Sequence, residues 1–162
     1  MELDQAAKKK VLRDITYGLY AVTAAHAGER GVFTANWLSQ ASFEPPLVML
    51  SVEIDSSTLP LIRGSGRLAV CPLHEGQKDL AGALGRPKVR AGDKYETLEL
   101  AVIDTASGVP ALAASLGYVV CEIRSEVPAG DSVVFIAEVI EARSFSDAPP
   151  LAMRQAGFRH AG

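Results

Sequence analysis

Polar side chains cluster between Thr34 and Thr58, in the stretch TANWLSQASFEPPLVMLSVEIDSST. Residues two apart in an extended strand share a face, so Thr34 and Asn36 would point one way and Ala35 and Trp37 the other. Asn is a poor strand former, and a buried amide costs free energy unless it is hydrogen-bonded. The strand therefore either presents Thr34 and Asn36 to a polar ligand or ends there in solvent, and both interpretations stay open.

A second polar cluster, Ser56-Ser57-Thr58, lies where a loop is expected to enter a short helix. Backbone N–H groups at a helix start favour an anion and hydroxyls add donors, so a phosphate would fit there. Helix capping is the simpler explanation, because it needs only one of the three hydroxyls. The sequence does not choose among the cations that could assist an anion, which are Arg63, Lys78, Arg86 and Lys88.

A polar strand and an anion site, separated by one apolar strand, suit a ligand with a planar polar head and a phosphate tail, which is the shape of FMN. Signatures of other chemistry do not occur: there is no GxGxxG after a strand, no P-loop, no GxSxG and no HExxH. His26, His74 and His160 are scattered, so neither a metal site nor a side-chain acid or base is predicted. Cys71 and Cys121 lie in apolar segments and are expected to be buried, reduced thiols.

The composition indicates a single domain over residues 1–162. The chain is 48% hydrophobic and 22% charged, which is typical of a globular protein. Sixteen Lys and Arg against 19 Asp and Glu give no electrostatic case for nucleic acid or an anionic membrane. The first residues, MELDQAAKKKVLRDI, are charged where a signal peptide would be hydrophobic, and we expect a cytoplasmic protein.

The remaining pattern indicates strands joined by short turns, with a few helices inserted. An N-terminal helix would place Ala7, Val11, Leu12 and Ile15 on one face. Helices are also expected over 56–66, capped by Ser57 or Thr58 and ended by Gly64, and over 75–85, before a basic surface loop over 86–93. Strands are expected over 19–26, 31–43, 47–52 (buried on both faces), 67–73, 95–102, 118–127 and 132–143. This order favours a mostly β fold, an antiparallel barrel with peripheral helices.

The order of these motifs resembles the flavin reductase-like, FMN-binding split-barrel family. Members carry T-A-N or T-A-S, then S-x-x-P-P, a buried strand and a hydroxyl cluster; here these are residues 34–36, 42–46, LVMLSV and 56–58. The resemblance extends from the GLYAVTA strand to the VPAGDSVVFIAEVIEA hairpin. The ending AGFRHAG is similar to the tail of members that work with flavodiiron or rubredoxin-type electron-transfer systems.

The resemblance implies a homodimer of six-stranded split barrels, each binding FMN, with FAD as the alternative, near the subunit interface. It also implies hydride transfer from NADH or NADPH to the flavin, with electrons passed to free flavin or to a partner such as a monooxygenase, a rubredoxin or a flavodiiron protein. No catalytic side chain is required, because hydride passes directly between the rings. The positions that would line the ring, lie under it and hold the phosphate are Thr34, Ala35, Asn36 and Trp37; Ser51 and Val52; and Ser56, Ser57 and Thr58.

One departure from the family pattern affects the nicotinamide side. Many members have G-D-H at the final hairpin, with the His near the nicotinamide, whereas this chain has Gly130-Asp131-Ser132. His160 is the remaining imidazole that could lie near Ser132. The departure motivates an alternative function, an FMN-containing electron carrier or redox sensor without significant NAD(P)H turnover. The sequence does not distinguish NADH from NADPH.

Overall fold

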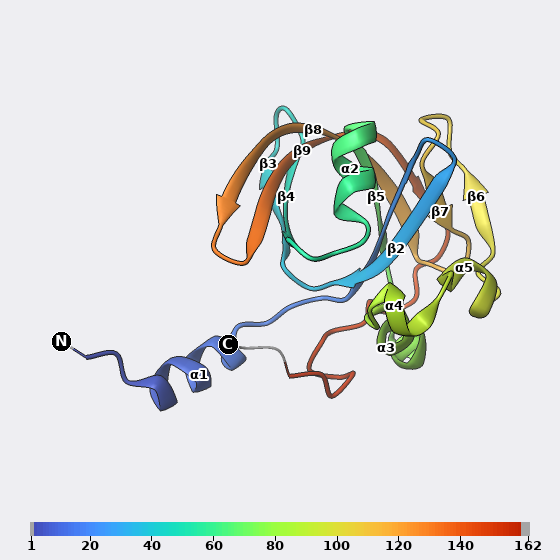
Figure 1. Cartoon of the computed structure of the whole chain (residues 1–162). Helices are drawn as coiled ribbons and strands as arrows, with labels where there is room; N and C mark the ends of the chain where they lie inside the picture. Colours follow the sequence, from blue (N-terminus) through green and yellow to red (C-terminus); the bar gives the residue numbers. More distant parts are fainter. Residues whose placement is uncertain (1, 160–162) are drawn as a thin grey trace.

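The computed structural model describes residues 2–159, and its main body is one curled antiparallel sheet (Figure 1). The seven strands of this sheet follow the order β2-β1-β5-β8-β9-β4-β3. Strands β6 (Val102–Asp104) and β7 (Pro110–Leu112) form a separate pair. The bounds of the main strands are β1 Tyr20–His26, β2 Glu29–Ala35, β3 Leu38–Ser42, β4 Leu47–Glu53, β5 Arg67–Pro72, β8 Gly117–Ala129 and β9 Ser132–Ser144.

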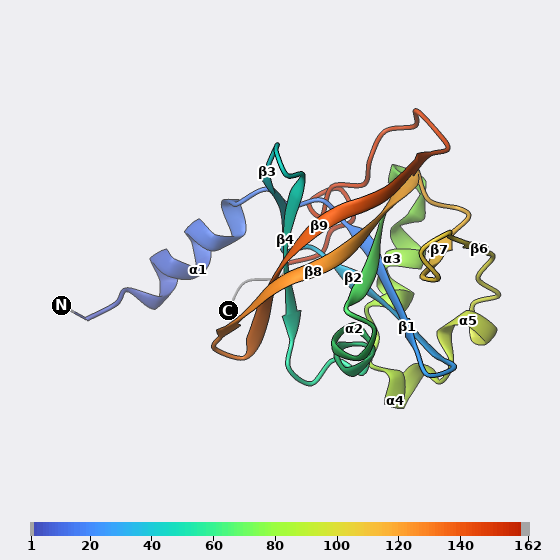
Figure 2. The same cartoon turned by 90° about the horizontal axis from the view of Figure 1, so that it is seen from above.

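The helices lie around this sheet, as the view from above also shows (Figure 2). Helix α2 (Leu59–Ser65) packs on β1 and β5 and buries Leu59, Leu61 and Ile62. A second group follows β5 and packs beside β2: the 3-10 helix η1 (Glu75–Gln77), α3 (Lys78–Leu84), α4 (Lys88–Ala91) and α5 (Lys94–Thr97). The predicted mostly β fold with peripheral helices is therefore confirmed.

The main sheet has seven strands rather than the expected six, because one predicted strand is two. The run over 31–43 breaks at Asn36 and Trp37 into β2 and β3, which lie at opposite edges of the sheet. Strand β2 pairs with β1, whereas β3 pairs with β4. The backbone N–H of Ser51 donates to the carbonyl oxygen of Trp37 at 3.0 Å. Asn36 and Trp37 thus occupy the corner at which the chain passes from one edge of the sheet to the other.

The strand expected over 95–102 is wrong, because a local cap and burial of one aromatic ring outweigh the β-like composition. The Asp93 carboxylate accepts the backbone N–H of Tyr95 at 2.8 Å and begins α5. Tyr95 is buried and donates its hydroxyl to the Gly31 carbonyl at 3.0 Å. Extended structure begins only at Val102, where β6 pairs with the unpredicted β7. The expected loop over 86–93 also contains one short helix, α4.

Two details of the central elements differ from expectation. Strand β4 is not buried on both faces: Leu50 and Val52 are buried, but Met49 is 42% exposed. Helix α2 ends at Gly66, whose φ of 67° is left-handed and accessible to glycine, rather than at Gly64. The expected glycine, Gly64, instead lies against the His26 ring, where any Cβ would collide.

The core consists of two clusters of buried apolar residues, and each contains one of the two cysteines. Cys71 and Cys121 are free and buried, as expected. Burial raises the pKa of Cys71 to about 11 and that of Cys121 to about 12, so both thiols stay protonated at neutral pH.

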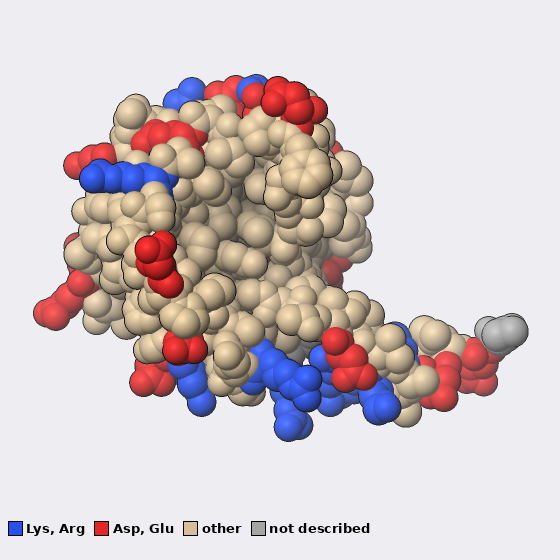
Figure 3. All heavy atoms as spheres, turned by 180° about the vertical axis from the view of Figure 1, so that it is seen from behind, with Lys and Arg blue, Asp and Glu red and all other residues tan. Residues whose placement is uncertain are grey.

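Helix α1 (Gln5–Asp14) forms as expected and projects from the body of the protein. Asp4 caps it by accepting the backbone N–H groups of Ala6 and Ala7, both at 3.0 Å. None of its residues is buried, and Val11 is 63% exposed. Lys and Arg side chains gather on and beside it (Figure 3). Within residues 2–159, no helix has both the length and the apolar character needed to cross a membrane.

Glu141 on β9 fastens the loop between β6 and β7 to the long β8–β9 hairpin. Its carboxylate accepts the Ser107 hydroxyl at 2.6 Å, the Ser107 N–H at 3.0 Å and the Tyr118 hydroxyl at 2.7 Å. The Ser107 hydroxyl, followed by the Tyr118 hydroxyl, lowers the pKa of Glu141. A lowered carboxylate pKa stabilises the fold above the unfolded-state pKa of about 4.3, and this contribution is lost as the pH falls through the folded-state pKa.

We expect Glu141→Gln to lower the free energy of unfolding at pH 7 by about 1 kcal/mol, the usual net value of such hydrogen bonds. Urea denaturation followed from pH 7 down to pH 3 measures the difference, and the wild type and variant should converge at the acid end. The exposed Glu99→Gln, remote from these contacts, is the matched control. A gap that stays constant with pH would contradict this account of the carboxylate.

Candidate functional site

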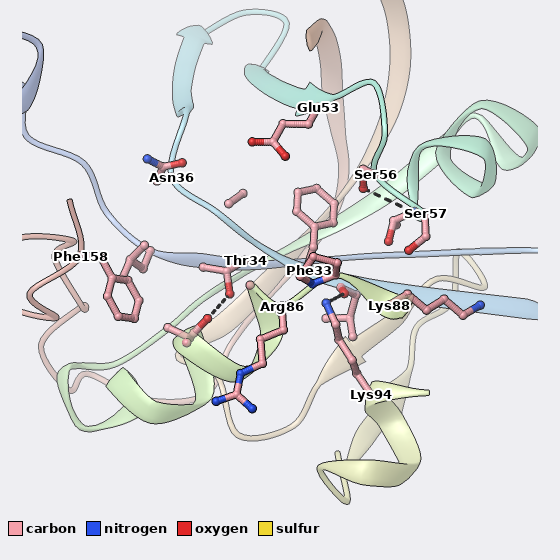
Figure 4. Close-up of a pocket in the computed structure, with 18 of the residues that line it drawn as sticks. Phe33, Thr34, Asn36, Glu53, Ser56, Ser57, Arg86, Lys88, Lys94 and Phe158 are labelled. Atoms are coloured by element: carbon pink, nitrogen blue, oxygen red, sulfur yellow. Dashed lines mark hydrogen bonds between the residues drawn. The ribbon is translucent and has the colours of Figure 1, made fainter. Parts of the chain in front are cut away.

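One cavity of ≈ 690 Å³ opens beside the corner between β2 and β3 (Figure 4). Its volume lies in the range of about 300–1,000 Å³ that is usual for small-molecule and cofactor sites. Four parts of the chain form its walls: the end of β2 with the corner, the β4–α2 loop, helix α3 with the segment up to α4, and the C-terminal segment. Residues distant in sequence therefore meet at one hollow.

The structure brings together all but one of the residues predicted to contact a flavin. Val52 is the exception: it points into the apolar core, because its neighbour Ser51 takes the cavity-facing position in the alternation of β4. The predicted residues that line the cavity are Thr34, Ala35, Asn36, Trp37, Ser51, Ser56, Ser57 and Thr58. Their roles toward a flavin stay predictions.

The two polar side chains of the corner strand have different tasks. The Thr34 hydroxyl donates to the carbonyl oxygen of Ala81 at 2.5 Å, so it ties α3 to β2 (Figure 4). The Asn36 amide donates to the sulfur of Met153 at 3.2 Å, and a thioether is a weak acceptor. Asn36 keeps its carbonyl oxygen and one N–H for a ligand, and Thr34 mainly shapes the wall.

The three hydroxyls of the cluster differ in their contacts. Thr58 takes the N-cap position of α2, one of the two positions expected, but its side chain makes no capping hydrogen bond. The Ser56 hydroxyl accepts the backbone N–H of Thr58 at 3.3 Å. Thr58 is buried and makes no side-chain capping bond, and its hydroxyl lies so close to Gly31 that a Cβ there would approach it to 2.6 Å. Ser57 is exposed at the cavity wall. Ser57 therefore carries the hydroxyl best placed for a ligand.

The structure selects two of the four cations that the sequence left open. Arg86 and Lys88 line the cavity. Arg63 forms an exposed ion pair with Glu126, away from the cavity wall, and Lys78 at the start of α3 does not line it either. An anion in the cavity would therefore meet Ser57, Arg86 and Lys88.

Lys94 is a wall residue that sequence reasoning missed. Its ammonium group is buried and donates to the carbonyl oxygen of Val32 at 3.1 Å and to that of Leu84. Burial lowers the pKa of Lys94, because the charged form loses hydration. These bonds fasten the segment after α3 to β2. No local pattern signals such a lysine, since its acceptors lie 10 and 62 positions away along the chain.

Further wall residues were also missed. The carboxylates of Glu53 and Asp55 stand on the β4 side, and Phe33 and Phe158 add aromatic surface (Figure 4). Glu53 and Asp55 directly follow the strand predicted over 47–52. They were not predicted as site residues, because acidic residues after a strand usually lie on the solvated surface. Phe158 reaches the wall only through the fold of the C-terminal segment.

Of the two positions predicted near a nicotinamide, the structure describes Ser132 alone. Ser132 is buried and its hydroxyl donates to the Asp131 carboxylate at 3.1 Å. It does not line the cavity, but its partner across the β4–β9 ladder is Glu53, which does. His160 lies outside the described residues. The roles of Ser132 and His160 toward a nicotinamide stay predictions.

Known proteins resemble this chain in sequence and in fold. A sequence profile of the flavin reductase like domain matches residues 12–162. The reductase component of 4-hydroxyphenylacetate 3-monooxygenase from Thermus thermophilus is 30% identical over 154 residues, covering 94% of each chain. The actinorhodin polyketide dimerase of Streptomyces coelicolor is 30% identical over 142 residues, covering 86% of this chain and 76% of the other.

A solved structure agrees over the whole chain. The NADH:FAD oxidoreductase of Streptomyces globisporus, in complex with NAD and FAD fragments, superposes with a TM-score of 0.81 at 25% identity. The match covers 100% of this chain and 98% of the other. Sequence, fold and cavity thus agree, and the chain belongs to the flavin reductase-like family.

Proposed function

We propose that the protein is a flavin reductase that binds its flavin in this cavity and reduces it with NADH or NADPH. One observation carries the proposal: a single cavity joins the polar corner at Asn36 to a hydroxyl and two cations at Ser57, Arg86 and Lys88. A relative from Streptomyces globisporus, 29% identical over 140 residues, is named an NADH-dependent FAD reductase. Its name supports the donor and the class of acceptor.

The residues of the cavity fit a flavin. A flavin has a flat ring with a polar edge and a phosphate at the end of a flexible chain. The cavity offers apolar wall from Leu19, Val32 and Phe33 for the flat ring. The Asn36 amide would bind the polar edge of the ring. The exposed Ser57 hydroxyl and the cations of Arg86 and Lys88, which also line the cavity, would bind the phosphate.

A bound flavin would supply the hydride-accepting ring, so the protein needs to supply position, electrostatics and access. Asn36 would bond the polar edge of the ring, while Ser57, Arg86 and Lys88 would hold the phosphate. The Thr34 and Lys94 hydrogen bonds keep the opposite wall in place. A rigid wall raises the rate by alignment, because a hydride donor must stack against the ring at short range.

The physiological partner is proposed to be an oxygenase that consumes the reduced flavin. Two relatives support this: the Thermus reductase component above and a Mycobacterium tuberculosis protein, 29% identical over 155 residues, named as the reductase subunit of a flavin-dependent monooxygenase. We also propose that the protein acts in the cytoplasm as a homodimer. Exposed apolar side chains on β4 and α1, Met49 and Val11 among them, suit burial against a second copy.

Ser57→Ala and Asn36→Ala should separate the two ends of the site. We expect Ser57→Ala to weaken FMN binding about fivefold and to leave riboflavin unaffected, because riboflavin has no phosphate. Asn36→Ala should weaken both ligands by a similar factor, since both carry the ring. Flavin fluorescence titration of the apoprotein measures each dissociation constant.

Ser39→Ala is the matched control for these variants, because Ser39 on β3 is exposed and does not line the cavity. Unchanged FMN affinity in both Ser57→Ala and Asn36→Ala would show that flavin binds elsewhere on the protein.

Anaerobic reduction in a stopped-flow instrument tests the reaction itself. The flavin-loaded protein mixed with NADH, and separately with NADPH, should lose its visible flavin absorbance much faster than free flavin does under the same conditions. The observation that favours an electron carrier instead is Ser132, at the position where other members have His. Bound flavin that either nucleotide reduces no faster than free flavin would establish the carrier and overturn the reductase.

A further inference from the structure

A small side cavity of ≈ 40 Å³ adjoins the main one at its hydroxyl end. The two cavities share Val32, Ser57, Lys88 and Lys94 as wall residues. The side cavity therefore continues the site beyond Ser57, the residue proposed to bind the phosphate. Any ligand that extends past this phosphate meets the side cavity next.

Arg30 lines the side cavity and not the main one, and it stacks on the ring of Tyr95. The guanidinium of Arg30 lies 4.3 Å from the centre of the Tyr95 ring. Tyr95 is itself held at both ends, by its hydroxyl on the Gly31 carbonyl and by its N–H on the Asp93 carboxylate. Arg30 is thus an exposed cation, supported by a buried ring, at the wall of the side cavity.

The charges of the side cavity favour an anion. Three cations, Arg30, Lys88 and Lys94, line it together with one carboxylate, Asp93. Asp93 already accepts the N–H of Tyr95, and Lys94 has given two of its three donors to carbonyl groups. The charge balance is positive in a chain whose overall charge is −3. Such a local set suits a phosphate, whose oxygens accept several charge-assisted hydrogen bonds.

We propose that this side cavity binds the second phosphate of a flavin dinucleotide, so that the protein prefers FAD to FMN. The inference rests on the proposed function, because it assumes that the first phosphate lies at Ser57. FMN ends at that phosphate, whereas FAD continues through a pyrophosphate to an adenosine. The extra phosphate of FAD would then lie within reach of Arg30 and Lys88. Arg30 is the specificity-determining residue in this assignment, since it lines only the side cavity.

The test compares the affinities of FAD and FMN in a titration that involves no turnover. Fluorescence titration of the wild-type apoprotein should give a dissociation constant for FAD about fivefold below that for FMN. Arg30→Ala should weaken FAD binding about fivefold and change FMN binding by less than about twofold. Arg30→Lys keeps the charge and should retain part of the preference.

Three controls make the result unambiguous. Thermal denaturation checks that Arg30→Ala is folded, and Arg30→Gln, which also removes the charge, serves in its place if it is not. Arg63→Ala, which removes a cation far from both cavities, should leave the ratio of the two affinities unchanged. Titration of the variant with NADH shows whether the pyrophosphate of the nicotinamide cofactor, rather than that of FAD, uses Arg30.

Equal wild-type affinities for FAD and FMN would overturn the inference, as would an Arg30→Ala variant that binds both flavins more weakly by the same factor. Loss of NADH binding with unchanged FAD binding would also overturn it. These outcomes leave the proposed function intact, since FMN still binds. A wild type that binds neither flavin would instead remove the proposed function together with this inference.

Discussion

The hydrogen bond from the Ser51 N–H to the Trp37 carbonyl oxygen holds the constraint on which the rest of the structure depends. It fixes the corner at which the chain leaves β2 at one edge of the sheet and enters β3 at the other. Asn36 lies in this corner rather than within a strand ladder, and it lines the cavity. The corner thus joins the two edges of the sheet and also places Asn36 at the wall of the cavity.

The opposite wall depends on side chains that bond to backbone. Thr34 reaches α3 and Lys94 reaches both β2 and the last turn of α3. A buried ammonium is costly, and hydrogen bonds to two carbonyls offset that cost only while the segment stays closed. Three polar contacts therefore add to the apolar burial of Ala81, Leu84 and Tyr95 in holding this wall of the cavity. Its geometry is set before any ligand arrives.

Local patterns in the sequence predicted most strands of the main sheet and the identity of the polar cluster, but not the break between β2 and β3. Alternation and turn residues located the β8–β9 hairpin and β1, and the motif order located Thr34 to Thr58. The features that the sequence did not predict depend on tertiary contacts. Tyr95 belongs to a β-like run, but it is buried in the core and donates its hydroxyl to the Gly31 carbonyl. The Val32 carbonyl that accepts from Lys94 lies far away along the chain, so the two meet only after folding. Thr58 takes one of the expected N-cap positions, but the hydroxyl that accepts a backbone N–H in this loop is that of Ser56, which hydroxyl spacing alone does not reveal.

The central claim is that flavin binds at the β2–β3 corner, and the most direct test uses the intrinsic fluorescence of the protein. Trp37 is the single Trp of the chain, and it lines the cavity. A flavin ring bound beside it absorbs at the wavelengths where Trp emits and should quench that emission almost completely, with saturation at one flavin per chain. Flavin that binds, as judged by its own fluorescence, while Trp37 emission stays unchanged would contradict the assignment of the site.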